Sequence, residues 1–215
     1  MEVHPPHGAV KSLKEVLREL SIITAGILIA LSLDGLLAWK HHHDLVREAR
    51  ANIISEIREN QRELGKEIEA LQKMDQQVQV LIDLVHHLEV NRKTPISELH
   101  YGFTVAELHS TSWNSATTTG AVSYMPYSEV KKYTELYDLQ HAYDALQERS
   151  FAASLDVQGL ATLLGRNSAS ITSAELSDAE RRLGISMANI KAMEQIAAPL
   201  NQRYTEVLKS VADGQ

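Results

Sequence analysis

Residues 20–39 read LSIITAGILIALSLDGLLAW, and this stretch decides which class of protein the chain encodes. A single carboxylate, Asp34, interrupts residues that are otherwise apolar or small. A helix needs about 20 residues to cross the hydrocarbon core of a bilayer, so the length fits a membrane span. A cleaved signal peptide would end in a small-x-small site, and no convincing one follows. The sequence therefore predicts a transmembrane helix, with the core helix of a soluble bundle as the competing interpretation.

The flanks of this stretch carry positive charge on both sides. Residues 11–20, KSLKEVLREL, alternate basic and apolar residues and either lie against lipid headgroups or form the first turns of the same helix. Trp39 stands where an interfacial aromatic residue belongs. A short basic flank before an uncleaved apolar run is typical of a signal-anchor. We therefore expect a single-pass protein of the bacterial inner membrane, with a cytoplasmic N-terminus and a periplasmic C-terminal domain.

Small residues recur at every fourth position of the predicted span, and Asp34 belongs to this row. Gly26, Ala30, Asp34 and Ala38 share one stripe of a helix, and small residues at this spacing let two helices approach closely. We interpret the stripe as a helix-association face with Asp34 as a polar contact. Two alternatives remain: Asp34 lies near the interface and reaches water, or it serves as a proton or cation site.

Three consecutive histidines, His41, His42 and His43, follow Trp39. On a helix they point about 100° apart, so they are poorly placed to meet one metal ion. Imidazoles titrate near neutral pH, which makes a pH-sensitive interface conceivable. The simpler interpretation is a set of interfacial side chains beside Trp39.

Behind the predicted span, apolar residues recur three and four positions apart along three long helices. The pattern divides the chain into an N-terminal tail and amphipathic lead-in at 1–19, the span at 20–39 and a helical domain at 40–215. Asn60 and Glu67 interrupt the first row. The first helix is expected to stop at Thr94-Pro95, the second at about Leu164 before Gly165. The rows comprise Ile53, Ile57, Leu64, Leu71, Met74, Val78, Leu81, Val85 and Leu88; then Leu136, Leu139, Tyr143, Leu146, Ser150, Ala153, Val157, Leu160 and Leu164; then Leu176, Ala179, Leu183, Ser186, Ile190, Met193, Ala197, Leu200, Tyr204, Val207 and Val211.

An irregular stretch at residues 94–127 separates the first long helix from the other two. Its Ser- and Thr-rich part predicts a short helix that ends at Gly120, and Ser128 is the expected N-cap of the next helix. Thr172 and Glu175 have the spacing of a capping box for the last helix. Aromatic residues gather around this stretch and form either a partner- or ligand-binding cap at the membrane-distal end or a structural plug: Trp113, Tyr124, Tyr127, Tyr133 and Tyr137.

The expected fold is all-α: one N-terminal transmembrane helix followed by a long, coiled-coil-like antiparallel bundle. Short connections make the last two helices a hairpin, and the hairpin packs along the helix that leaves the membrane. The same rows of apolar residues would also serve packing between subunits, and periodicity does not separate the two arrangements.

Composition excludes several functional classes. A net charge of −7 argues against nucleic acid as a partner, because phosphate binding needs a basic face. The chain has no cysteine, so disulfides and thiolate metal sites are excluded. It has no phosphate-binding glycine loop, nucleophile elbow or zinc-protease motif. We therefore expect no enzyme activity and no cofactor.

Two stretches resemble single-span bacterial membrane proteins of an acidobacterial type. The first is GILIALSLDGLLAWKHHHDLVREARANIISEIREN, preceded by His4-Pro5-Pro6-His7, and the second is SWNSATTTGAVSYMPYSEVKKYTELYDLQ. The resemblance covers about half the chain and implies the single-span topology. That family has no established activity to carry over.

Taken together, the residues favour a membrane-anchored scaffold or accessory protein. Its expected partners are the lipid bilayer and a second copy of the chain or another membrane protein. The alternative is a membrane-bound sensor with a ligand or pH input.

Overall fold

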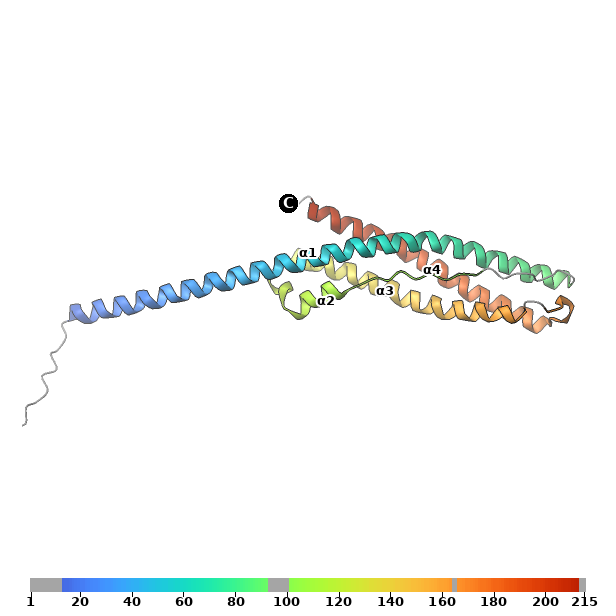
Figure 1. The fold of residues 1–215 in the computed structure, drawn as a ribbon, viewed down its shortest axis with the longest axis horizontal. Coiled ribbons are helices and arrows are strands. Elements are labelled where there is room, and N and C mark those ends of the chain that lie inside the picture. Colours follow the sequence, from blue (N-terminus) through green and yellow to red (C-terminus); the bar gives the residue numbers. More distant parts are fainter. Residues whose placement is uncertain (1–12, 93–100, 164–165, 213–215) are drawn as a thin grey trace, which may run out of the picture. The chain divides into compact units, whose positions relative to one another are not determined.

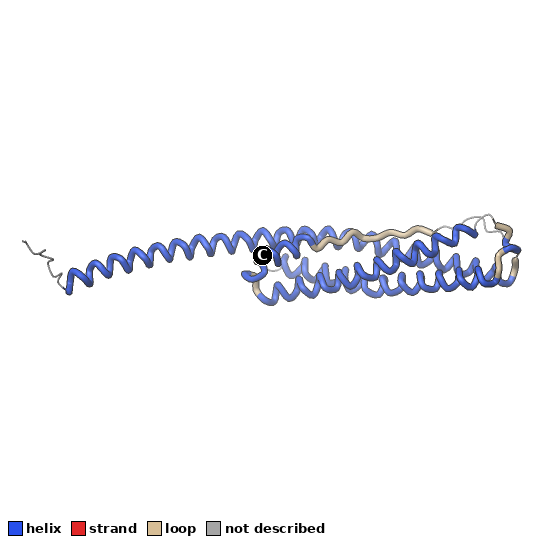
Figure 2. The backbone as a smooth tube through the Cα atoms, turned by 90° about the horizontal axis from the view of Figure 1, so that it is seen from below, coloured by secondary structure: helices blue, strands red, loops and turns tan. Residues whose placement is uncertain are grey.

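The computed structural model describes residues 13–92, 101–163 and 166–212, and every regular element in them is helical (Figures 1 and 2). This confirms the all-α prediction. The motif His4–His7, the Thr94-Pro95 helix stop and Gly165 lie outside the described residues. The elements are α1 (Leu13–Val90), α2 (Thr111–Thr118), α3 (Tyr127–Gln158) and α4 (Ser173–Ala212), with short 3-10 helices η1 (Ala121–Tyr124), η2 (Gly159–Leu163) and η3 (Ser168–Ser170).

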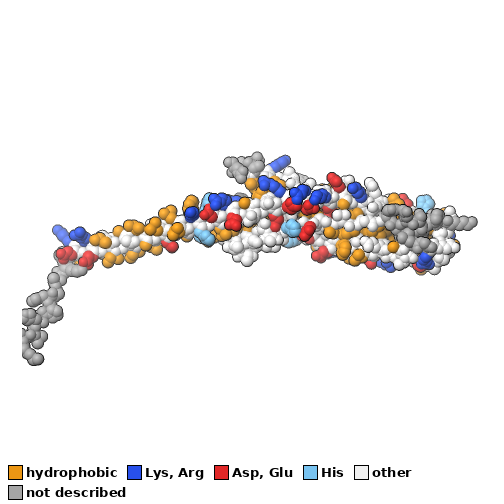
Figure 3. All heavy atoms as spheres, in the orientation of Figure 1, with side chains coloured by type: hydrophobic (Ala, Val, Ile, Leu, Met, Phe, Trp, Pro, Cys, Tyr) orange, Lys and Arg blue, Asp and Glu red, His pale blue; other side chains and the backbone are white. Residues whose placement is uncertain are grey.

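The chain divides into two compact units, Met1–Glu48 and Ala49–Gln215. In the first unit, α1 contains a stretch long and apolar enough to cross a membrane, and none of that stretch is buried. Hydrophobic side chains cover its surface in Figure 3. The competing interpretation, a core helix of a soluble bundle, requires these side chains to be buried. They are exposed, as Ile27 and Leu31 illustrate at 54% and 62%.

In the second unit, three long helices pack lengthwise, and polar contacts fix their directions. Residue pairs between α1 and α3 rise together in number, from Arg50–Glu129 to Glu67–Gln147, so these helices run parallel. Pairs between α1 and α4 run in opposite order, from Gln61–Thr205 to His86–Glu180. The α3–α4 hairpin is therefore antiparallel and packs along α1, as the sequence predicts.

The apolar rows read from the sequence form the core of this bundle. In α1 all nine predicted positions, from Ile53 to Leu88, are buried, and in α4 the row from Leu176 to Val207 is buried throughout. The α3 row is less accurate. Leu139 and Leu146 are half-buried, whereas the residues after them, Gln140 and Gln147, are fully buried.

An extended segment, residues 101–110, fills the place that a second long helix would take in an up-down-up-down bundle (Figure 2). We call it the strap. Its Gly102 amide N–H donates to Gln77 of α1 over 3.0 Å, and its His109 N–H donates to Asn60 over 2.8 Å. At 1.5 Å per residue, positions 60 and 77 of a helix lie about 26 Å apart. Seven strap residues reach at most about 25 Å, so the strap is almost fully stretched.

Local chemistry explains how the remaining elements begin and end. Gly120 follows α2 with φ +78°, a left-handed conformation that glycine adopts without steric cost, so the predicted helix end is confirmed. Thr172 and Glu175 form the predicted capping box, with N–H to side-chain distances of 2.8 and 3.2 Å.

Two predicted helix ends of α3 are wrong. The helix begins at Tyr127, with Pro126 in place of Ser128 as the N-cap, because proline already fixes φ at a value that suits the entry to a helix. It ends at Gln158, before the predicted end at Leu164, and the 3-10 helix η2 follows directly.

Candidate functional site

Three of the five predicted cap residues form one aromatic cluster. The rings of Trp113 and Tyr137 stack with centroids 5.7 Å apart at 6°, and Tyr133 packs against Trp113 at 6.0 Å. Tyr133 and Tyr137 are buried, whereas Tyr124 and Tyr127 are 51% and 82% exposed. The cluster joins α2 to the first turns of α3.

The cluster lies beside the first turns of α1 in the second unit. Arg50 and Glu129 form a two-bond ion pair with both N–O distances at 2.7 Å, and the Tyr137 hydroxyl donates to Glu56 over 2.7 Å. This contact with α1 could not be predicted, because the strap, which carries the chain back along α1, has no periodic pattern of its own.

The buried tyrosine hydroxyls of the cluster are engaged with carboxylates. Besides Tyr137 with Glu56, the Tyr133 hydroxyl donates to Glu129 over 3.2 Å. Burial, followed by the neighbouring carboxylate, raises the pKa of both phenols far above the ordinary value, so they stay protonated. These contacts support the plug interpretation for Tyr133 and Tyr137.

Below the cluster, a first polar layer crosses the core. Asn60 Nδ2 and Gln140 Nε2 both donate to the His109 carbonyl, over 2.6 and 3.1 Å. The Tyr204 hydroxyl donates to Gln140 Oε1 over 2.7 Å, and Asn60 Nδ2 donates to the same oxygen over 3.1 Å. Asn60, Gln140 and Tyr204 are fully buried. This layer joins α1, α3, α4 and the strap backbone.

One heptad further along, a second polar layer repeats the arrangement with a carboxylate. Gln147 Nε2 donates to both oxygens of Glu67 over 3.2 Å and to the Ala106 carbonyl over 3.0 Å. Glu67 is 1% exposed, and burial raises the pKa of its carboxyl to about 7, although hydrogen bonding from its neighbours partly offsets this effect. Among the described residues, no Lys, Arg or His acts on this carboxylate.

The two layers explain why polar residues occupy core positions. A helix satisfies its own backbone groups, but an extended segment packed on a bundle leaves its N–H and C=O groups without internal partners. Asn60 and Glu67, seven residues apart in α1, and Gln140 and Gln147, seven apart in α3, face those groups. The interruption at Asn60 and Glu67 is visible in the sequence. The matching residues of α3 were missed because nearby leucines fit the apolar row better.

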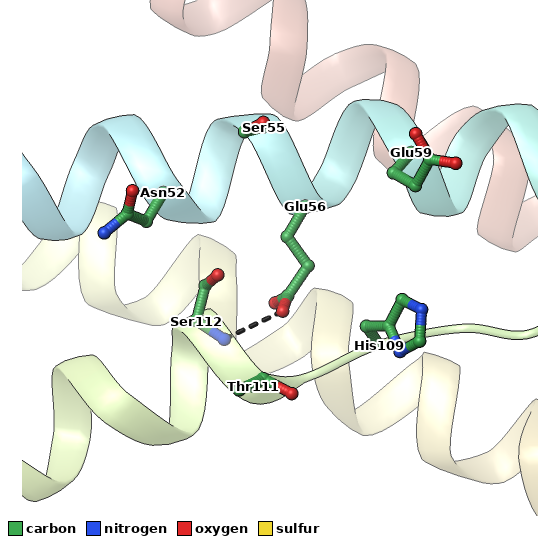
Figure 4. A pocket seen from close by; sticks show the side chains of 7 residues that line it. All are labelled: Asn52, Ser55, Glu56, Glu59, His109, Thr111 and Ser112. Atoms are coloured by element: carbon green, nitrogen blue, oxygen red, sulfur yellow. Dashed lines mark hydrogen bonds between the residues drawn. The ribbon is translucent and has the colours of Figure 1, made fainter.

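Two surface cavities flank the aromatic cluster. One, of about 490 Å³, is lined by Ile54, Tyr133 and Val207 with Arg50 and Lys132 among its polar groups. The other, of about 390 Å³, is open and polar (Figure 4).

The polar cavity carries two carboxylates with structural roles. Glu56 accepts the Ser112 N–H over 2.8 Å and so satisfies an N-terminal amide of α2, and Glu59 pairs with Arg62. Figure 4 places the His109 ring on the same side as Glu59, with no hydrogen bond drawn between them. Across the described part of the chain, no three His, Asp or Glu residues are arranged to hold a metal ion.

The remaining predicted sites lie in the first unit. His43 stacks on Trp39 with centroids 5.6 Å apart, and its Nδ1 lies 3.9 Å from the Asp44 carboxylate. His41 and His42 pack ring to ring at 5.9 Å. The predicted association face, Gly26, Ala30, Asp34 and Ala38, is exposed along the apolar stretch.

Comparison of the chain with protein-family models, with curated proteins and with solved structures found no match.

Proposed function

We propose that the protein is a membrane-anchored helical scaffold or accessory subunit that acts through protein contacts. The observation that carries the proposal is the contrast between the two units. The bundle buries its own apolar rows, whereas the apolar side chains of residues 20–39 have no cover among the described residues. Single apolar side chains on a surface are ordinary, but a large continuous apolar surface indicates contact with lipid or with a partner protein.

Lipid is the cover that the composition favours. A partner protein usually covers one face of a helix, whereas the exposed large residues here lie all round it, among them Ile22, Ile23, Leu28, Ile29, Leu33 and Leu36. The stacking of His43 on Trp39 supports an interfacial belt at the end of the span. The proposed location is the bacterial inner membrane, with the bundle on the periplasmic side.

Protein contacts are proposed because the described residues offer little for catalysis. The buried carboxylate and amides of the bundle are occupied by the strap, and the carboxylates of the polar cavity hold α2 and Arg62. The proposed self-association face is the stripe Gly26, Ala30, Asp34 and Ala38, where the absence of large side chains permits close helix approach.

Replacement of Gly26 and Ala30 together by isoleucine is the first test. Added bulk on this stripe separates the helices, so we expect the cross-linked dimer in bilayer nanodiscs to fall at least tenfold. Leu28→Ile, on another side of the helix, is the matched control and keeps wild-type association. An unchanged dimer yield in the double variant contradicts the proposed face.

The second candidate is a sensor, favoured by the 490 Å³ cavity beside Tyr133 and by the ring contacts of His41–His43. The same cross-linking assay at pH 5.5 and pH 8 separates the two functions. A scaffold gives equal association at both values. A sensor that uses the histidines gives different association, and replacing all three by glutamine removes the difference.

A further inference from the structure

The strap is held by polar contacts more than by burial of its own side chains. Of residues 101–110, Ala106 alone is buried, and Phe103, which packs against Phe151 at 5.7 Å, is half-buried. The strap therefore gives up little apolar surface on leaving its groove.

Its polar contacts are directed at backbone atoms. Gln77 holds the Gly102 N–H, Gln147 holds the Ala106 carbonyl, and Asn60 holds both the N–H and the carbonyl of His109. These three partners, and Gln140, which also donates to the His109 carbonyl, are neutral amides, whose charge does not change with pH. Glu67 is the ionisable group among these contacts, because the Gln147 amide that donates to the strap also donates to the Glu67 carboxyl.

We propose that Glu67 makes the strap a proton-operated latch, seated on the bundle while the carboxyl is neutral and loosened when it ionises. A neutral carboxyl is tolerated in the dry layer under Ala106. An ionised carboxylate is costly in this layer, because none of the described residues places a cation beside it. Water stabilises the ionised form, and water reaches it when the strap leaves the groove.

The titratable groups that face Glu67 come from α3 and α4. From α3, Tyr143 faces it and Asp144 adds negative charge; the strap presents the Ala106 backbone. Asp144 is half-buried, and burial raises the pKa of its carboxyl while His141 opposes the shift. From α4, Tyr204 acts on Tyr143, and burial keeps both phenols protonated.

The sign of the effect follows from the raised pKa of Glu67. The seated form keeps its proton up to about pH 7, whereas the released form, exposed to water, loses it near the ordinary value of 4.5. Between these values each pH unit favours release by roughly tenfold. The strap is therefore tightest below about pH 4.5 and loosens as the pH rises to 7, with no further change above.

Hydrogen exchange of the full chain in detergent tests the latch. After correction for the chemical rate at each pH, we expect protection of the Gly102 and His109 amides to fall about a hundredfold between pH 5 and pH 8. The Ile190 amide in α4 reports unfolding of the whole bundle, which exposes Glu67 as well, so its protection should fall by a similar factor but stay well above that of the strap at every pH. Glu67→Gln keeps a neutral side chain at every pH, so its strap protection should be flat; the exposed Glu69→Gln should behave as wild type.

Three results would overturn the proposal. Wild-type strap protection that does not change with pH excludes the latch. A fall that persists in Glu67→Gln assigns it to another group, such as the exposed His109. Strap protection equal to that of Ile190 at every pH means that the strap opens only when the whole bundle unfolds.

Discussion

Arginine at both Ile27 and Leu31 is expected to move the full-length protein from the membrane pellet to the supernatant of an alkaline carbonate wash. These residues lie in the middle of the apolar stretch, and their side chains are exposed. An arginine at the centre of a membrane helix costs about 3 kcal/mol on insertion scales, so the pair removes about 6 kcal/mol of insertion free energy. Immunoblots of pellet and supernatant measure the shift.

The matched control places arginine at exposed apolar residues of the bundle. Val80 and Leu155 are exposed to a similar degree, at 65% and 51%, but lie outside the predicted span. The double variant Val80→Arg/Leu155→Arg should stay in the pellet. Equal release of both double variants would mean that added charge, and not its position, controls the partition.

Gln140→Leu is the second large effect, and it should lower the free energy of unfolding by about 2–4 kcal/mol. Leucine fits the volume, but the buried Tyr204 hydroxyl loses its acceptor and the His109 carbonyl loses one of two donors. Buried polar groups without partners cost more than an ordinary hydrogen bond contributes. Urea unfolding followed by circular dichroism measures the change.

The exposed glutamine Gln202 provides the control for this substitution. Gln202→Leu removes a surface contact with Glu206 and should change stability by less than about 0.5 kcal/mol. Were Gln140→Leu as stable as the wild type, the first polar layer would not fasten the strap to the bundle.

The sequence predicted those parts of the fold where one helical period repeats over a long helix. The rows of α1 and α4 are confirmed, since their positions from Ile53 to Leu88 and from Leu176 to Val207 are buried. The capping box at Thr172 and the helix end at Gly120 are confirmed because they depend on local chemistry. The apolar stretch was found by length and composition alone.

The strap and its polar layers could not be predicted, and the physical reason is the same for both. An extended segment of ten residues has no periodicity, and its groove is marked by polar residues that look like errors in an apolar row. Gln140 and Gln147 therefore appeared as surface positions beside Leu139 and Leu146. Their heptad spacing, which matches Asn60 and Glu67, was the available signal.

The aromatic cluster illustrates a mixed outcome. Its residue types and spacing brought Trp113, Tyr133 and Tyr137 to attention, and the structure joins them. Tyr124 and Tyr127, on either side of Pro126 at the start of α3, are largely exposed. Which end of the bundle holds the cluster could not be predicted, because it depends on the path of the strap.

The central claim, that residues 20–39 lie in lipid, is tested most directly by cysteine labelling of membrane fragments open on both sides. The chain has no cysteine, so Ile29→Cys and Val80→Cys each provide one reporter. We predict that a water-soluble maleimide modifies Cys at 80 at once and Cys at 29 only after the bilayer is dissolved and the protein denatured. Equal labelling at both positions in intact membranes would contradict the account.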